Sequence, residues 1–164
     1  MAFLEVYTKF KGDLGVVDQQ GRSALVHSIA NNHDTFTRMI CEFSSIFAHQ
    51  IEEPSTFTNL IELRDRHGNT PLFVAVRYNR PECVKTLIGF QCNFFHRKKN
   101  GNTILHECAV NNSIECLIII ASYCGQELYS IGNKEGLRAI DIALKMKNME
   151  TLQALQKMER NLMY

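Results

Sequence analysis

Cysteine and histidine are the residues of this chain best suited to metal binding or nucleophilic catalysis. The sequence contains six of each among its 164 residues. The cysteines form none of the closely spaced pairs typical of zinc sites, and the seven-residue gaps between Cys108, Cys116 and Cys124 match no zinc pattern. We therefore predict no metal site and expect reduced thiols, most of them buried as small apolar side chains. A reactive thiol is the alternative.

Catalytic patterns are also absent from the sequence. His106 and Cys108 lie close together, but no acid pair and no glycine loop of the form G-x-x-x-x-G-K accompanies them. We therefore predict no catalytic residues, no cofactor and no enzyme activity.

A recurring phrase indicates how the chain is organised. A glycine precedes a short apolar stretch at Gly21, Gly68, Gly101 and Gly136, so the steps are 47, 33 and 35 residues. A period of about 33 residues, interrupted by one insertion, is typical of tandem helical repeats.

Each phrase contains the signals of a short helix. Ser23, Thr70 and Thr103 are candidate N-caps that accept a backbone N–H bond, and Pro71 suits a first helical position. Small residues follow five positions after the cap position, where neighbouring helices must approach closely: Ser28, Ala75, Cys108 and Ala143. Asparagine follows nine positions after it at Asn32, Asn79 and Asn112, and predicts a left-handed turn. Lys147 and Asn148 occupy this place in the fourth repeat, so we expect its turn to shift by one residue.

A second apolar pattern follows each turn at helical spacing and predicts an outer helix packed on the first. Its members are Phe36, Met39, Ile40, Val84, Leu87, Ile88, Leu117, Ile118, Ile120, Leu152 and Leu155. No repeat buries that face alone, so the repeats must stack and the two ends need caps. We expect a C-terminal cap with polar residues at Gln153 and Gln156, and an N-terminal cap with apolar residues between Phe3 and Phe10.

These columns resemble the ankyrin repeat pattern. Thr70, Pro71, Leu72 and Ala75 match it in the second repeat, as do Thr103, Leu105 and His106 in the third. The resemblance implies an all-α solenoid in a single domain, with His106 bonded to the backbone of the adjacent turn. Its expected parts are a cap (1–17), repeat one (18–43), an insertion (44–63), repeat two (64–96), repeat three (97–131) and repeat four with a C-terminal cap (132–164).

The insertion is the segment least like the repeats. We expect the preceding outer helix to continue through Ile46 and Phe47 to Ile51, to stop before Pro54, and to be followed by a loop with Phe57, Leu60 and Ile61. Those apolar residues either pack on the convex side of the stack or form an exposed patch for a partner.

The resemblance implies partner binding through the turns, called fingers, and the exposed positions of the inner helices. Arg66, Arg77 and Tyr78 are central in this prediction, because arginine and tyrosine are frequent in binding hot spots. The full predicted set is Arg66, His67, Asn69, Val74, Arg77, Tyr78, Lys99, Asn102, Glu107 and Asn111. We expect Arg77→Ala with Tyr78→Ala to abolish binding without lowering the melting temperature.

The charge distribution bears on the kind of partner. The net charge is only +1, but basic residues concentrate in repeats two and three, as at Arg64, Arg80, His96, Arg97 and Lys98. Such a cluster favours an acidic partner, whereas the alternative is an ordinary solvated surface. The low net charge and the absence of a nucleic-acid-reading module make direct nucleic-acid binding a less favoured interpretation.

The sequence also bears on location and class. It has no run of about 18 apolar residues and no signal-peptide pattern at its start, which together with the cysteine usage favours the cytoplasm or nucleus. Four repeats with short flanks resemble the short viral IκB-like ankyrin proteins, the vankyrins. That resemblance implies inhibition of an NF-κB factor by sequestering its Rel-homology dimer. The alternatives are a scaffold or adaptor for another protein and a regulatory segment of a larger enzyme or channel.

Overall fold

The structure is a computed structural model, and it describes residues 14–50 and 59–161. The predicted N-terminal cap between Phe3 and Phe10 lies outside the described residues. So does the middle of the insertion, which includes Ile51, Pro54 and Phe57.

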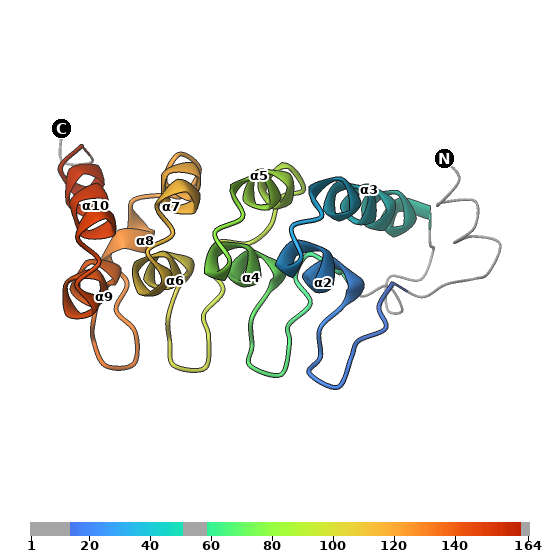
Figure 1. The fold of residues 1–164 in the computed structure, drawn as a ribbon, viewed down its shortest axis with the longest axis horizontal. Helices are drawn as coiled ribbons and strands as arrows, with labels where there is room; N and C mark the ends of the chain where they lie inside the picture. Colours follow the sequence, from blue (N-terminus) through green and yellow to red (C-terminus); the bar gives the residue numbers. More distant parts are fainter. Residues whose placement is uncertain (1–13, 51–58, 162–164) are drawn as a thin grey trace.

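The described residues form four helical pairs that stack side by side. The pairs are α2 (Ala24–Ala30) with α3 (Asp34–Gln50), α4 (Pro71–Arg77) with α5 (Pro81–Gly89), α6 (Ile104–Asn111) with α7 (Ile114–Ala121), and α9 (Ala139–Met146) with α10 (Met149–Asn161). Figure 1 shows the inner helices α2, α4, α6 and α9 in one row, the outer helices in a second row, and the fingers projecting together from the inner row. The predicted all-α repeat solenoid is confirmed. Within residues 14–50 and 59–161, no helix is long and apolar enough to cross a bilayer.

The inner helices begin in three different ways. Ser23 accepts a bond from the backbone N–H of Val26 at 3.5 Å, as predicted for an N-cap. Thr103 interacts with His106 instead, since Nδ1 of the imidazole accepts from the backbone N–H of Thr103 at 3.2 Å and lies 2.8 Å from its hydroxyl. Thr70 has the extended backbone of an N-cap, but its buried hydroxyl makes no hydrogen bond within the described part of the chain. The capping bond predicted for Thr70 is therefore wrong, and Pro71 at the first helical position defines the start of α4.

The turns between inner and outer helices adopt the left-handed conformation. Asn32, Asn79 and Asn112 have φ values of 60°, 48° and 53°, which confirms the asparagine prediction. Lys147 has φ 59° at the equivalent position, so the predicted one-residue shift of the fourth turn is wrong. The spacing is fixed by the stack, because Asn148 on the next position donates from Nδ2 to the carbonyl oxygen of Ala109 at 2.8 Å.

The core forms between the two rows of helices. The small-residue column is buried at all four of its positions, and so are most of the predicted outer-helix positions. Phe36, Met39 and Ile88 are half-buried, whereas Ile118 of α7 is 52% exposed, so the prediction that it packs inward was wrong. Its neighbours Leu117 and Ile120 are buried in the core.

The described part of the insertion joins the same core. Helix α3 continues to Gln50, and Leu60 and Ile61 are buried among the core side chains. One short helix, α8 (Glu127–Ser130), was not predicted; it lies between α7 and α9 and buries Leu128 and Tyr129.

Candidate protein-binding surface

The fingers are tight turns closed by one acidic or amide side chain. In the second finger, Oδ1 of Asp65 accepts the backbone N–H groups of His67 at 2.9 Å and Asn69 at 2.8 Å. Asp18 and Asn133 accept equivalent bonds in the first and fourth fingers. These three fingers therefore have fixed shapes, since a side chain three residues before the finger glycine organises the backbone. In the third finger Lys98 holds that place, and Oδ1 of Asn100 accepts the backbone N–H of Asn102 at 3.1 Å.

Neighbouring fingers also bond to one another. The backbone N–H of Arg66 donates to the carbonyl oxygen of Gln20 at 2.9 Å, and the backbone N–H of Lys134 donates to the carbonyl oxygen of Asn100 at 3.0 Å. Gly101 lies at the second of these contacts with φ +83°, and a Cβ atom there would lie 2.8 Å from the nitrogen of Lys134. The row of fingers is thus held by backbone contacts as well as by the helices below.

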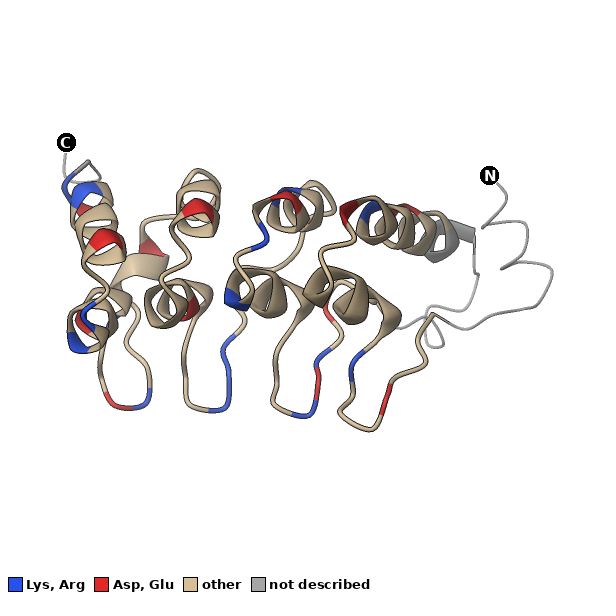
Figure 2. Ribbon diagram, viewed as in Figure 1, with Lys and Arg blue, Asp and Glu red and all other residues tan. Residues whose placement is uncertain are grey.

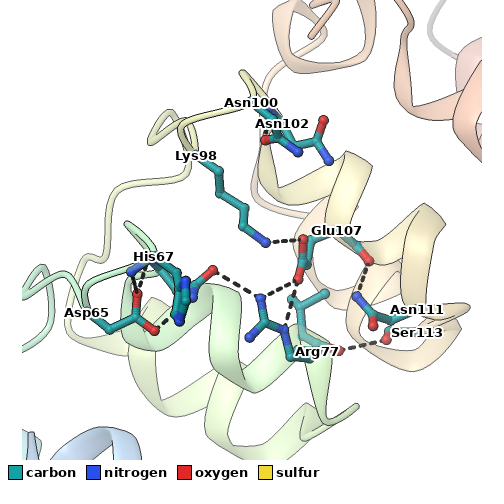
Figure 3. A network of polar contacts seen from close by, with 11 residues as sticks. Asp65, His67, Arg77, Lys98, Asn100, Asn102, Glu107, Asn111 and Ser113 are labelled. Atoms are coloured by element: carbon teal, nitrogen blue, oxygen red, sulfur yellow. Dashed lines mark hydrogen bonds and ion pairs between the residues drawn. The ribbon is translucent and has the colours of Figure 1, made fainter. Parts of the chain in front are cut away.

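Glu107 is the centre of an ion-pair network between repeats two and three (Figure 3). Its carboxylate is almost fully buried and lies 3.2 Å from Nη2 of Arg77 and 2.8 Å from Nζ of Lys98. Nη2 of Arg77 also donates to Oδ1 of Asn69, whose Nδ2 in turn donates to Asp65 at 2.7 Å. A buried carboxylate needs such partners, because an unpaired charge in the interior is costly.

This network corrects part of the predicted surface. Asn69, Val74, Asn102 and Glu107 were predicted as exposed contact residues, but all four are buried. The three polar ones are hydrogen-bonded inside the stack, and Val74 packs in the core.

Arg77 is partly exposed, but its guanidinium is committed to Glu107 and Asn69. Contrary to the earlier expectation, we therefore expect Arg77→Ala to lower the melting temperature, since it would leave buried Glu107 with Lys98 alone. Tyr78 is the cleaner probe of this surface.

The remaining predicted residues do lie on the surface. Tyr78 is 48% exposed at the end of α4, and its neighbours on the fingers and α6 are exposed as well. These neighbours are Arg66, His67, Lys99 and Asn111. Whether they contact a partner stays a prediction.

A pocket of about 170 Å³ opens beside Tyr78, between repeats one and two. Its apolar part is formed by Val26 and Ala30 of α2 and by Val74 of α4. Its polar rim is formed by residues of the first two fingers and the end of α4: Gln20, Arg22, Asp65, His67 and Arg77.

The predicted basic cluster is partly neutralised. Nε2 of His96 contacts the carboxylate of Glu62, and Arg64 contacts Nδ1 of the same ring. Arg97 donates to the carbonyl oxygens of Gly101 and Gly132. Figure 2 shows basic and acidic positions together on the fingers and on the helices behind them. At the tips of the second and third fingers, neither Arg66 nor Lys99 has an ion-pair partner among the described residues, and the same holds for Arg64, Arg80 and Arg97 of this cluster.

The cysteines are free thiols, five of them buried and Cys124 half-buried. Burial raises the pKa of four of them to about 12, those of Cys41, Cys83, Cys92 and Cys116, and raises that of Cys108 as well. A thiol with a raised pKa is a poor nucleophile at neutral pH, because the thiolate is the reactive form. In the described part of the chain, no three His, Cys, Asp or Glu side chains form a group able to hold a metal.

His106 has a structural position. Burial lowers its pKa, and Nε2 of the ring lies 2.8 Å from the carbonyl oxygen of Leu137 in the next finger. Nε2 therefore donates to Leu137, and Nδ1 accepts from Thr103. The expected bond from His106 to the adjacent turn is present.

Sequence reasoning missed the residues beneath the surface that position it. The roles of three of them were not predicted. Asp65 closes the second finger, Lys98 pairs with Glu107, and Glu62 contacts His96. The one usable signal was that Asp18, Asp65 and Asn133 each stand three residues before a finger glycine.

Comparison with known proteins agrees with this architecture. Residues 3–96 match the family model for ankyrin repeats (three copies). The chain is 24% identical over 141 residues to the nuclear factor NF-kappa-B p105 subunit of Gallus gallus, and 23% identical over 170 residues to the transient receptor potential cation channel subfamily A member 1 of Homo sapiens. It is also 29% identical over 94 residues to Rabankyrin-5 of Mus musculus.

These alignments cover 85%, 88% and 57% of this chain but only 14%, 15% and 8% of the three relatives. The chain therefore spans a small part of the length of the relatives it matches. The family match and the four stacked helical pairs point to the same conclusion. The chain belongs to the ankyrin repeat family of protein–protein interaction modules.

Proposed function

We propose that this chain is a non-enzymatic scaffold or adaptor that binds a partner protein through its finger tips and the exposed ends of its inner helices. One observation carries the proposal: the same position, eight residues after each N-cap, is exposed in all four repeats. These residues form the inner-helix strip, which consists of Asn31, Tyr78, Asn111 and Met146. The four residues stand at the C-terminal ends of the inner helices, which form one row with the fingers projecting from it (Figure 1).

Two features of the strip favour protein binding. Tyr78 offers a large, half-exposed aromatic side chain near the middle of the strip, and tyrosine is enriched in binding hot spots. Arg66 and Lys99 on the adjacent finger tips offer positive charge that would speed encounter with an acidic partner. Arg77 supports this face from below through its bonds to Glu107 and Asn69.

A pull-down with the tagged chain, read by mass spectrometry, tests the proposal. We expect Tyr78→Ala with Lys99→Ala to lose the captured partner while keeping the wild-type melting temperature, since both side chains are exposed. Ile118→Ala is the matched control, because Ile118 is equally exposed but lies on an outer helix. Loss of capture in the Ile118 variant alone would move the binding surface to the outer helices and contradict the proposal.

A second candidate function is inhibition of a Rel-homology transcription factor, as in IκB-like proteins. The similarity to the p105 subunit over 85% of this chain supports it. The direct test is to mix the purified chain with a purified Rel-homology dimer and measure DNA binding by the dimer. Dose-dependent loss of DNA binding would support the inhibitor function. The absence of a complex at micromolar concentration would contradict the inhibitor function and would not affect the adaptor proposal. The similarity to a cation channel gives comparable support to a regulatory segment of a larger protein.

We also propose that the chain works in the cytoplasm or nucleus. Its six thiols are unpaired, as is usual in a reducing compartment. Fractionation of expressing cells, with the tagged chain detected in each fraction, tests this assignment.

A further inference from the structure

The junction between repeats one and two, where the pocket opens, differs in its residues from the junction between repeats two and three. Ala30 and Val74 contribute to the pocket, one from each repeat. One repeat later, Arg77 holds the position of Ala30, seven residues after the N-cap. Glu107 likewise holds the position of Val74, four residues after the N-cap. There the space is occupied by the Arg77–Glu107 ion pair. The first groove is therefore open because two small apolar residues replace a pair of long charged ones.

The charged groups on the rim of the pocket already have partners. Arg22 pairs with Asp18 at 2.8 Å, Arg77 pairs with Glu107, and the carboxylate of Asp65 accepts bonds from two backbone N–H groups and from Nδ2 of Asn69. An entering group thus meets no unpaired charge inside the pocket. Val26 and Val74 line the pocket with the small part of their side chains that the surrounding protein leaves uncovered.

The size of the pocket limits what can enter. A cavity of about 150 Å³ lined by apolar side chains is large enough to bind benzene. The 170 Å³ pocket therefore suits a phenylalanine or leucine side chain, with the ring of Tyr78 at its edge. Burying such a side chain strengthens binding by at least about ten-fold, which is the contribution of a typical anchor residue.

The residues around the pocket indicate which charge the ligand carries beside its apolar side chain. His67 lines the pocket, and its chain neighbour Arg66 lies at the tip of the second finger. Nζ of Lys99 on the third finger donates to the carbonyl oxygen of Arg66 at 3.3 Å, which brings the two basic residues together. Since neither has an acidic partner among residues 14–50 and 59–161, a carboxylate on the ligand would complete the site.

We propose that the pocket binds a peptide segment of a partner protein that presents one phenylalanine- or leucine-sized side chain and a nearby acidic residue. The apolar side chain enters between Ala30 and Val74, and the carboxylate lies beside Arg66 and Lys99. This proposal rests on the proposed function and adds to it the recognition chemistry and the repeats involved.

Selection of random dodecapeptides displayed on phage against the immobilised chain tests the proposal. We expect enriched peptides to share one large apolar residue with an aspartate or glutamate close to it. A synthetic peptide of that consensus should bind at least ten times more weakly to Ala30→Leu, which fills the pocket without changing charge. Val110→Leu is the matched control, because Val110 holds the position of Ala30 in repeat three, and its affinity should stay within about two-fold of wild type.

Arg66→Glu separates the acidic contact from the apolar one. We expect it to weaken binding several-fold at low salt and less at high salt, since the contact lies at an exposed finger tip. As a readout that needs no variant, the methyl resonances of Val26 and Val74 in the wild-type chain should shift when the peptide is added.

The outcomes distinguish this proposal from the broader one. Binding that Tyr78→Ala abolishes but Ala30→Leu leaves unchanged would refute the pocket and keep the proposed surface. Binding insensitive to Ala30→Leu, Tyr78→Ala and Arg66→Glu would refute both. A selection that enriches no peptide, or only peptides without an apolar anchor, would also overturn the pocket proposal.

Discussion

The contact between the third and fourth fingers allows a quantitative test of how rigidly the repeats are joined. Gly101 and Gly136 occupy equivalent finger positions and have similar backbone angles, with φ +83° and +75°. A Cβ atom at Gly136 would meet no atom within 4 Å, whereas one at Gly101 would lie 2.8 Å from the nitrogen of Lys134. Alanine at either site must therefore adopt the same unfavourable left-handed backbone, but only alanine at Gly101 also clashes with the neighbouring finger.

The shared cost is the left-handed backbone. Alanine in that region is disfavoured by about 1–2 kcal/mol, and the reduced entropy of the unfolded chain offsets about 0.4–1 kcal/mol of this. We expect Gly136→Ala to lower the free energy of unfolding by about 1 kcal/mol. Gly101→Ala must also separate the fingers, which strains the packing by about 1 kcal/mol or more and weakens the bond from Lys134 to Asn100.

The expected loss for Gly101→Ala is therefore about 3 kcal/mol, or about 6–12 °C in melting temperature for a chain of this size. Urea titration of both variants, followed by circular dichroism, measures the difference directly. Hydrogen exchange should also show faster exchange of the Lys134 amide in the Gly101 variant only. Equal destabilisation of the two variants, within about 0.5 kcal/mol, would show that the fingers move apart freely and would refute the rigid-contact reasoning.

Four further predictions concern single sites and pH. His106→Ala should cost about 3 kcal/mol, because it leaves the buried N–H of Thr103 and the carbonyl of Leu137 without partners, and urea titration checks this value. Burial lowers the pKa of His106 in the folded chain, so its contribution to stability is complete above the unfolded-state pKa near 6.5 and falls as the pH drops below it. Between neutral pH and pH 5.5, the free energy of unfolding of the wild type should therefore fall by up to about 1.4 kcal/mol more than that of His106→Ala. Lys147→Gly should raise the free energy of unfolding by about 1 kcal/mol by relieving a φ of 59°, whereas Lys147→Ala should leave it unchanged; thermal melts decide between these results. Four thiols have a pKa of about 12 in the folded chain, so above pH 9 they lose their protons in the unfolded chain first and the free energy of unfolding falls. Each thiol should remove about 1.4 kcal/mol of stability per pH unit above pH 9, measured by urea titrations in reductant. A free energy of unfolding that does not change between pH 9 and 10 would contradict their burial.

The fold could be predicted from the sequence because each repeat restates the same local rules. Pro71 fixes the start of one helix, and Asn79 fixes the turn that follows it. Four copies of one pattern at nearly one period leave few alternatives to a stack. The prediction failed where a neighbouring repeat decides the outcome, as at Lys147, whose left-handed turn is imposed by the bond from Asn148 to Ala109.

The candidate surface was less predictable, since exposure depends on what lies across the groove. Glu107 and Val74 occupy the same position in successive repeats and were both predicted as exposed contacts. Glu107 is buried because Arg77 and Lys98 reach it from another repeat and from a finger. No pattern within one repeat specifies the contact with Arg77, because Arg77 lies 30 residues away in the preceding repeat.

The sequence by itself determined the repeat, the helix starts and turns, and the column of small residues that lets the helices approach, since all of these follow from propensities within about 33 residues. Only the tertiary structure decided which of the charged residues are free. Arg66 and Lys99 keep their charge unpaired on the finger tips, while Arg77 is held by Glu107. It also decided that a pocket opens between the first two repeats, whereas the Arg77–Glu107 ion pair lies between the next two. The physical reason is that ion pairs and cavities arise between side chains brought together by stacking.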